Sequence, residues 1–134
     1  MIVVDTNIIG YLYLTSDRSA QAEQVLLKDP AWAAPLLWRS EMRNVLARYI
    51  RNQMLSLEEA LQIMAEAINL MEDREYEVSS FQVLELTVAS TCSAYDCEFI
   101  ALAKDLNIPL VTVDQQILAQ FPGAAVPLEE YITP

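Results

Sequence analysis

The sequence predicts an α/β fold in which a central, mainly parallel sheet is flanked by helices in three layers. Short apolar runs alternate along the 134 residues with longer segments of helical periodicity. Strands separated by helices favour parallel pairing, because each helix carries the chain back to the start of the next strand. No linker, repeat or low-complexity stretch interrupts this order, and the length suits one compact domain over residues 1–134.

The first elements follow from apolar runs and proline. Ile2 to Val4 is a buried strand that leads into a helix through Ile8 to Leu12. A second helix is expected at about Ala20 to Leu27. Trp32 to Ala34 is a short strand, and Pro35 after it suits a helix start.

Two long helices come next and are expected to form a hairpin. The first covers about Leu36 to Asn52 and has one apolar stripe, made of Met42, Val45, Leu46 and Tyr49. Ser56 to Glu59 is a capping box for the second, which reaches about Met71.

The remaining elements alternate again between strand and helix. The acidic stretch Glu72 to Glu77 overlaps a short strand near Tyr76 to Val78. The pattern then predicts helices at about Ser80 to Thr91 and Ala94 to Leu106, a strand at Leu110 to Val113, a short helix, and a last strand at Ala125-Val126.

The composition limits both the setting and the chemistry. The hydrophobic fraction is 54%, yet no apolar run approaches the roughly 20 residues of a membrane-spanning helix. We expect a cytoplasmic protein, because Met1 to Asp5 has no basic leader. The excess apolar content, with Trp32 and Trp38 beside a short strand, predicts a homodimer interface.

The absence of histidine excludes whole classes of catalytic site. A Ser-His-Asp or Cys-His nucleophile cannot form, and two cysteines alone do not make the usual zinc ligand sets. We expect Cys92 and Cys97 to be buried free thiols. Carboxylate remains in quantity, and it is the hard oxygen ligand that suits magnesium, manganese or calcium.

Four acids stand where strands, loops and helices meet. Asp5 and Asp114 follow predicted strands, and Asp96 lies in the first turn of the helix before the Asp114 strand. Ligands collect at the carboxyl ends of parallel strands, so these three side chains are expected to lie close together. Glu41 joins them if its long helix packs along the same edge of the sheet.

Each acid also has a structural interpretation. Asp5 and Asp114 suit helix N-caps, and Ser93 to Asp96 has the form of a capping box. Glu41 borders the apolar stripe of its helix, where a carboxylate costs free energy unless something compensates it. Capping and metal binding do not exclude each other, so both interpretations stay open.

Four segments carry a resemblance to a known family. They are Val3 to Asn7, Ser40 to Leu46, Ser93 to Ala103, and Ile108 to Asp114. In this order and spacing they resemble the PIN-domain ribonucleases, most closely the VapC-like toxin of a VapBC toxin-antitoxin pair. The resemblance spans nearly the whole chain.

This resemblance implies a PIN-like fold and a metal-dependent endoribonuclease. By resemblance, the metal-binding acids are Asp5, Glu41, Asp96 and Asp114, and the supporting polar groups are Thr6, Asn7 and Thr112. One or two Mg²⁺ or Mn²⁺ ions would acidify a water and neutralise charge on the phosphodiester. Asp5 and Asp96 are expected as direct ligands, Glu41 as a direct or water-mediated ligand, and Asp114 as a supporting group. No role transfers to Glu98, which is expected on another helix face.

The net charge of −11 opposes broad affinity for nucleic acid, because Lys and Arg supply most phosphate neutralisation. RNA contacts must therefore be local. Arg43 and Arg48, on the helix of Glu41, are possible contacts, although taken singly each arginine fits a solvated surface role better. The acidic stretch Glu72 to Glu77 could meet a basic partner, and the resemblance implies an antitoxin that blocks the site with a basic side chain.

Other classes fit the sequence less well. A haloacid-dehalogenase phosphatase needs a second aspartate where this chain has Asn7, and a receiver domain needs a lysine after a late strand, whereas Lys104 precedes it. A non-catalytic PIN-fold module that binds RNA or protein is the remaining alternative.

Overall fold

Five parallel strands form the centre of the computed structural model, which describes residues 1–134. Their order across the sheet is β3-β2-β1-β4-β5, and every neighbouring pair is parallel. The strands are β1 (Ile2–Val4), β2 (Trp32–Pro35), β3 (Glu75–Tyr76), β4 (Leu110–Thr112) and β5 (Ala125–Pro127). The prediction of a parallel α/β sheet is confirmed.

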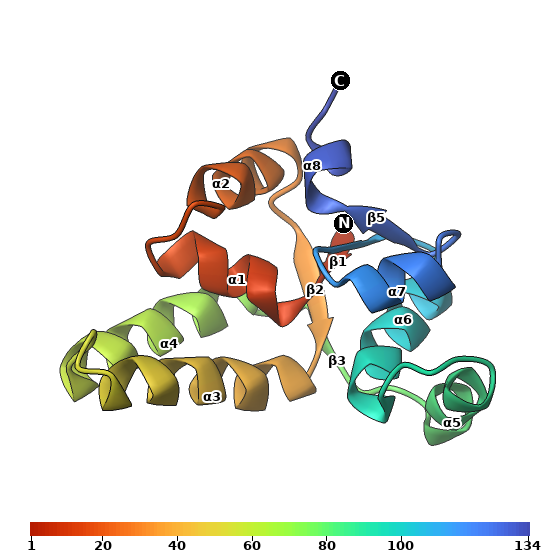
Figure 1. Ribbon diagram of the computed structural model, residues 1–134, viewed down its shortest axis with the longest axis horizontal. Helices are drawn as coiled ribbons and strands as arrows, with labels where there is room; N and C mark the ends of the chain where they lie inside the picture. The colour runs from red at the N-terminus through yellow and green to blue at the C-terminus, as the bar shows by residue number, and fades with distance from the viewer.

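Helices cover both faces of this sheet, as Figure 1 shows. One group is α1 (Thr6–Tyr13), α2 (Ser19–Lys28), α3 (Leu37–Arg51) and α4 (Leu57–Met71). The group on the other side is α5 (Ser80–Val88), α6 (Ala94–Leu106) and α7 (Gln115–Gln120). A short α8 (Leu128–Tyr131), which the sequence pattern did not predict, follows β5.

Pro35 corrects one expected boundary. It ends β2 rather than starting a helix, because it pairs with Tyr76 of β3. The next residue, Leu36, donates its amide to the Tyr76 carbonyl at 3.0 Å before α3 begins at Leu37. Proline has no N–H to donate, and the pairing of β2 with β1 on its other side already ends at Ala33.

Other boundaries shift by a few residues. The strand expected near Tyr76 to Val78 lies at Glu75–Tyr76, and α5 ends at Val88 rather than Thr91. β4 stops at Thr112, so Val113 lies outside it. These are pairing and capping effects, which a hydrophobic pattern does not contain.

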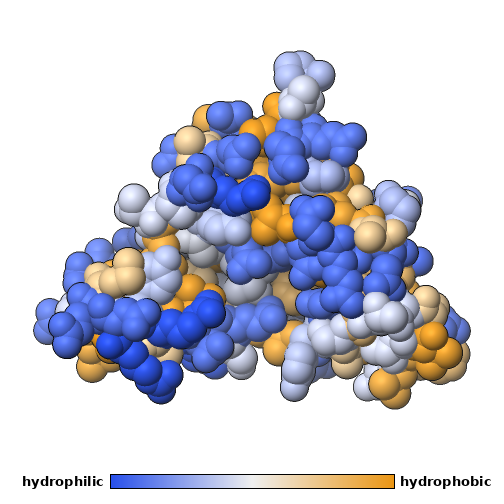
Figure 2. Space-filling model, viewed as in Figure 1, coloured by the Kyte–Doolittle hydropathy of each residue, from blue (hydrophilic) through white to orange (hydrophobic).

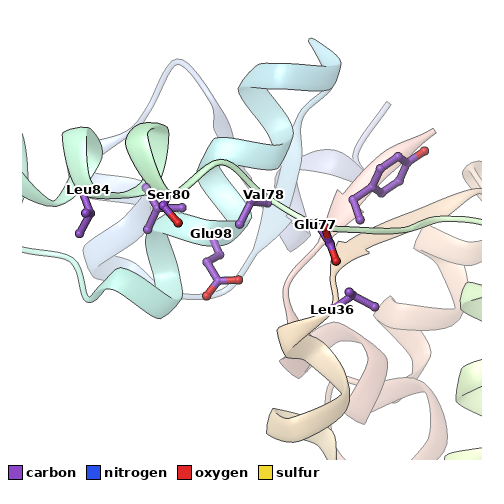
Figure 3. Close-up of a pocket in the computed structure, with 8 residues that line it drawn as sticks. Leu36, Glu77, Val78, Ser80, Leu84 and Glu98 are labelled. Carbon is purple, nitrogen blue, oxygen red and sulfur yellow. The ribbon is translucent and has the colours of Figure 1, made fainter.

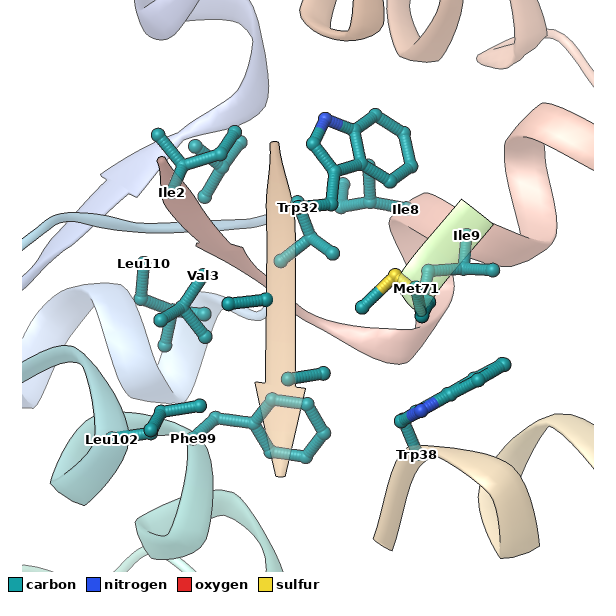
Figure 4. Packing of buried hydrophobic residues seen from close by; sticks show 14 of the residues in the cluster. Ile2, Val3, Ile8, Ile9, Trp32, Trp38, Met71, Phe99, Leu102 and Leu110 are labelled. Carbon is teal, nitrogen blue, oxygen red and sulfur yellow. The ribbon is translucent and has the colours of Figure 1, made fainter. Parts of the chain in front are cut away.

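The core is one cluster of 31 buried residues. In Figure 4, Phe99 and Leu102 of α6 lie on one side of the strands, while Ile8, Ile9 and Met71 lie on the other. Trp32 and Trp38 are both 0% exposed within this core, so they contribute no surface to the interface that the apolar content predicts. The helices that pack around β2 therefore bury both tryptophans within one chain.

Other apolar residues are exposed, and three of them lie together on α5. Phe81, Leu84 and Val88 are 73%, 59% and 89% exposed and follow one helical stripe. Hydrophobic residues gather over α5 at the lower right of Figure 2. We call these three residues the α5 stripe.

None of the eight helices combines the length and apolar character that crossing a membrane requires.

Candidate active site

The carboxyl ends of β1 and β4 bring the first two acids together. Val4 pairs with Val111, and the Asp5 amide donates to the Val111 carbonyl at 3.2 Å. The Thr112 hydroxyl donates to Asp5 Oδ2 and accepts from the Asp114 amide at 3.0 Å. Thr112 is therefore a buried link between the two strand ends, at the edge where ligands bind in parallel sheets.

Both strand-end acids also cap helices. Asp5 Oδ1 accepts from the Asn7 amide at 2.6 Å at the start of α1. Asp114 Oδ1 accepts from the Ile117 amide at 3.0 Å at the start of α7. The capping interpretation is correct for both residues, and both carboxylates line one cavity.

Helix α3 brings Glu41 to the same place. The Thr6 hydroxyl donates to Glu41 Oε1 at 2.7 Å, joining the first turn of α1 to α3. Met42 and Leu46 are buried on the face of α3 that packs into the core, and this fixes the side of the helix from which Glu41 projects. Glu41 is half-buried, so a carboxylate there needs compensation.

Helix α6 supplies Asp96. Ser93 is its N-cap, and the Ser93 hydroxyl accepts from the Asp96 amide at 3.1 Å. The cap is therefore Ser93, and Asp96 occupies the first turn with its half-buried side chain at the cavity. Cys92 and Cys97 nearby are buried free thiols, as expected.

All four carboxylates line one cavity of about 220 Å³, which we call the acidic cavity. Its other walls include Thr6, Asn7, Asn44, Val45, Arg48, Phe99 and Ile117. Asn44 and Phe99 were not singled out from the sequence. Asn44 could have been found there, because it lies three residues after Glu41 and four before Arg48 on one helical face.

Burial and mutual repulsion make these acids harder to ionise. Burial raises the pKa of Asp5; hydrogen bonds from Thr112 and Asn7 oppose this, and the charges of Asp114 and Asp96 raise the pKa further. The pKa of Glu41 is raised by burial, partly offset by its bond from Thr6.

Burial also raises the pKa of Asp96, and the charge of Asp114 adds to this while Ser93 opposes it. No Lys or Arg forms an ion pair with any of the four acids, since the three ion pairs of the protein lie elsewhere. The cluster therefore carries charge that the chain itself does not neutralise, as sites for divalent cations do.

The donor set matches a hard cation. Carboxylate, hydroxyl and amide oxygens are the ligands that Mg²⁺ and Mn²⁺ prefer, and neither histidine nor thiolate lines the cavity. As the side chains stand, no three of the acids are close enough together to enclose one ion. The residues fit such an ion in their chemistry, and side-chain adjustment would have to bring them onto it.

Comparison with known proteins decides the family. A family model for the PIN domain matches residues 2–123. The chain belongs to the PIN domain family. This PIN domain is 27% identical over 129 residues to Ribonuclease VapC3 of Pyrobaculum aerophilum, covering 94% of this chain and 98% of the relative.

Solved structures show the same fold at low identity. A crystal structure from Pyrobaculum aerophilum has a TM-score of 0.77 and 20% identity, covering 98% of this PIN domain and 92% of that chain. A toxin-antitoxin complex from Klebsiella pneumoniae has a TM-score of 0.72 and 20% identity, covering 96% and 98%. For FitAcB from Neisseria gonorrhoeae the values are 0.71 and 17%, with 96% and 99% covered.

Two charged residues near the acids lie outside the acidic cavity. Arg43 is exposed and does not line it, whereas Arg48 does. Glu98 extends from α6 into a separate cavity of about 430 Å³, whose lining also includes Leu36, Val78 and Leu84 (Figure 3). The charge of Glu98 still contributes to the raised pKa of Glu41, so it adds to the negative field without belonging to the cluster.

Proposed function

We propose that this PIN domain, over residues 1–134, is a metal-dependent endoribonuclease that hydrolyses RNA phosphodiester bonds, and that it is the toxin of a toxin-antitoxin pair. The observation that carries the proposal is the set of four unneutralised carboxylates around one cavity. The name of the VapC3 relative, Ribonuclease, supports the substrate, and the toxin-antitoxin complex from Klebsiella pneumoniae supports the pairing.

The side chains of the acidic cavity have different roles in this proposal. Asp5, Asp96 and Glu41 would hold Mg²⁺ or Mn²⁺, with Asp114 supporting them. A bound divalent ion would supply positive charge for the phosphate and acidify a water that attacks it. Thr6 and Thr112 hold Glu41 and Asp5 by the hydrogen bonds described above, which orients these carboxylates before substrate arrives.

The remaining wall residues shape the cavity around the reaction. Phe99 and Ile117 are buried apolar residues of its lining and limit the water around the carboxylates. A drier site strengthens every electrostatic interaction within it.

Arg48 is the RNA contact that the cavity favours. It lines the acidic cavity and forms no ion pair, so its guanidinium is available to a phosphate. Arg43, on the same helix but outside the cavity, provides a matched control. With so few cations, RNA binding should depend only shallowly on salt.

The test is cleavage of a structured RNA panel in Mn²⁺ or Mg²⁺, with a chelator control and duplex DNA as competitor. We expect RNA cleavage that needs the ion, severe loss in Glu41→Gln, and a larger loss in Arg48→Ala than in Arg43→Ala. If the parent protein binds RNA but does not cleave it, the proposed ribonuclease activity is wrong and the non-catalytic binding module is supported.

The partners belong to the same proposal. The expected antitoxin would block the acidic cavity with a basic side chain, for which the unneutralised carboxylates are the complement. We also propose a homodimer whose interface is the α5 stripe, because the two tryptophans are buried within one chain. The expected setting is the cytoplasm, and the two buried free thiols are compatible with a reducing compartment.

A further inference from the structure

A second cavity adjoins the acidic one. It encloses about 150 Å³ and lies between α1 and α3. Thr6, Asn7, Val45 and Arg48 line both cavities, so the two share a wall. The second cavity is closed on its own side by Gly10, Tyr11, Leu14 and Tyr49, among others, and we call it the tyrosine cavity.

No acid lines the tyrosine cavity, which separates it chemically from its neighbour. The four carboxylates therefore repel an anion less strongly in the tyrosine cavity than in the acidic cavity. An uncharged group can enter the tyrosine cavity without separating any acid there from a cation. Arg48 is the only charged side chain in its lining. A chain with alternating anionic and uncharged planar groups would match the two cavities in turn.

Tyr11 and Tyr49 give the cavity two aromatic rings whose hydroxyl groups have no hydrogen-bond partner. Both rings are half-buried against the core, and neither hydroxyl forms a hydrogen bond within the protein. Tyr13, on the same helix as Tyr11, differs because it does not line the cavity and its hydroxyl donates to the Glu66 carbonyl at 3.3 Å. A planar ligand could therefore pack its face against a tyrosine ring and form hydrogen bonds from its edge to a tyrosine hydroxyl.

Gly10 leaves the space open. It is buried in α1, yet a Cβ built on it would meet nothing within 4 Å. Glycine inside a helix costs stability relative to alanine, and no contact in the structure explains its presence here. The position therefore leaves room beside the two rings at a cost to its own helix.

We propose that the tyrosine cavity receives one nucleobase of the RNA whose scissile phosphate lies in the acidic cavity, with Arg48 bridging the two through the phosphate. This rests on the proposed function. Single-stranded RNA is recognised by bases that stack on aromatic side chains, and such stacking is tolerant of base identity because every base has a π-face. Tyr11 and Tyr49 thus select an unpaired nucleotide beside the cleavage site.

The first test uses uncharged nucleosides, which carry no phosphate and need no metal. Adenosine, guanosine, cytidine and uridine are titrated separately while the tyrosine ring resonances are followed by NMR, assigned with Tyr11→Phe and Tyr49→Phe. We expect at least one nucleoside to shift both rings saturably. Tyr49→Leu should weaken this binding by roughly tenfold, the loss expected for one aromatic partner.

Gly10→Ala is the variant that guards against misfolding. Its methyl enters open space, so the fold should hold and the melting temperature should rise, while the tyrosine cavity becomes smaller and nucleoside binding weakens. If no nucleoside shifts either ring up to its solubility limit, the proposal is overturned, and the cavity is left to another occupant such as a side chain of a protein partner.

The second test uses RNA lacking one base at each position beside the mapped cleavage site. At one of these positions, loss of the base should lower the rate at which the parent protein cleaves the RNA. Gly10→Ala should lower the rate of cleavage of intact RNA but should not lower further the rate for the RNA that lacks this base. Equal slowing of both RNAs would overturn the proposal. If RNA is not cleaved at all, the proposed function fails while the nucleoside titration still decides the cavity; RNA cleavage without nucleoside binding rejects the cavity alone.

Discussion

Asp5 shows how one residue serves the fold and the site together. Its carboxylate caps α1 through the Asn7 amide and accepts the Thr112 hydroxyl, yet only 8% of the residue is exposed. A purely structural cap could lie at the surface, where ionisation costs little. Keeping this carboxylate among three others costs folding free energy, which a bound cation would offset.

The pH dependence of stability measures that cost. Burial raises the pKa of Asp5 in the folded protein, so the folded state binds this proton more tightly than the unfolded state does. The carboxyl therefore favours the folded state at low pH, and this contribution is lost as pH rises from about 4 through the folded pKa. In chelator, the free energy of unfolding of Asp5→Asn relative to the parent should increase over that window.

Urea unfolding of both proteins across pH gives the measurement. Asp29 and Glu75, whose pKa values are lowered, have the opposite pH dependence, but they are present in both proteins and cancel in the difference. A difference that does not change with pH would mean that Asp5 is not destabilised by its ionisation.

At the residue scale, the sequence located the acids because strand ends and helix starts are visible in apolar patterns. Asp5 and Asp114 follow apolar runs, and Asp96 follows a capping serine. The link made by Thr112 required the pairing of β1 with β4. The tyrosine cavity could not be seen at all, because it depends on the packing of α1 against α3.

Among the helices, two serine N-caps set the residues at which α6 and α4 begin. Ser93 caps α6 beside Asp96, and Ser56 caps α4 in a complete capping box at the far end of the helical hairpin. Both caps were predictable, since serine followed three residues later by an acid marks a helix start. The end of β2 at Pro35 was not, because only its pairing with Tyr76 fixes it.

The two caps form a matched pair for experiment. Ser93→Ala and Ser56→Ala should each lower the free energy of unfolding by about 1 kcal/mol, the usual cost of losing an N-cap. Only Ser93→Ala should also weaken the stabilisation that Mn²⁺ gives in thermal melts, because it frees the first turn that carries Asp96. Equal Mn²⁺ shifts in both variants would show that the Ser93 cap does not position a ligand.

At the scale of the whole molecule, the buried tryptophans change the reason for expecting a dimer. The parallel three-layer fold followed from the alternation of elements, but which apolar residues remain exposed depends on how the helices pack. That packing buries Trp32 and Trp38 and leaves the α5 stripe in solvent.

Light scattering over a dilution series tests the dimer. The parent should have twice the monomer mass, and Leu84→Asp should shift it to monomer because a charge enters an apolar contact. Leu57→Asp, at a residue similarly exposed on α4, should leave the mass unchanged. A parent that stays monomeric at high concentration would reject the dimer, and a dimer in Leu84→Asp would move the interface away from α5.

If the acidic cavity is a metal-dependent RNA-cleaving site, two aspartates of α6 must differ in their effect on cleavage. Asp96 lines the cavity, whereas Asp105 is exposed on the last turn of the same helix. The measurement is the rate of RNA cleavage against Mn²⁺ concentration for the parent, Asp96→Asn and Asp105→Asn. We expect parent-like cleavage in Asp105→Asn and severe loss in Asp96→Asn. Cleavage by Asp96→Asn with the parent's rate and Mn²⁺ dependence would contradict this expectation.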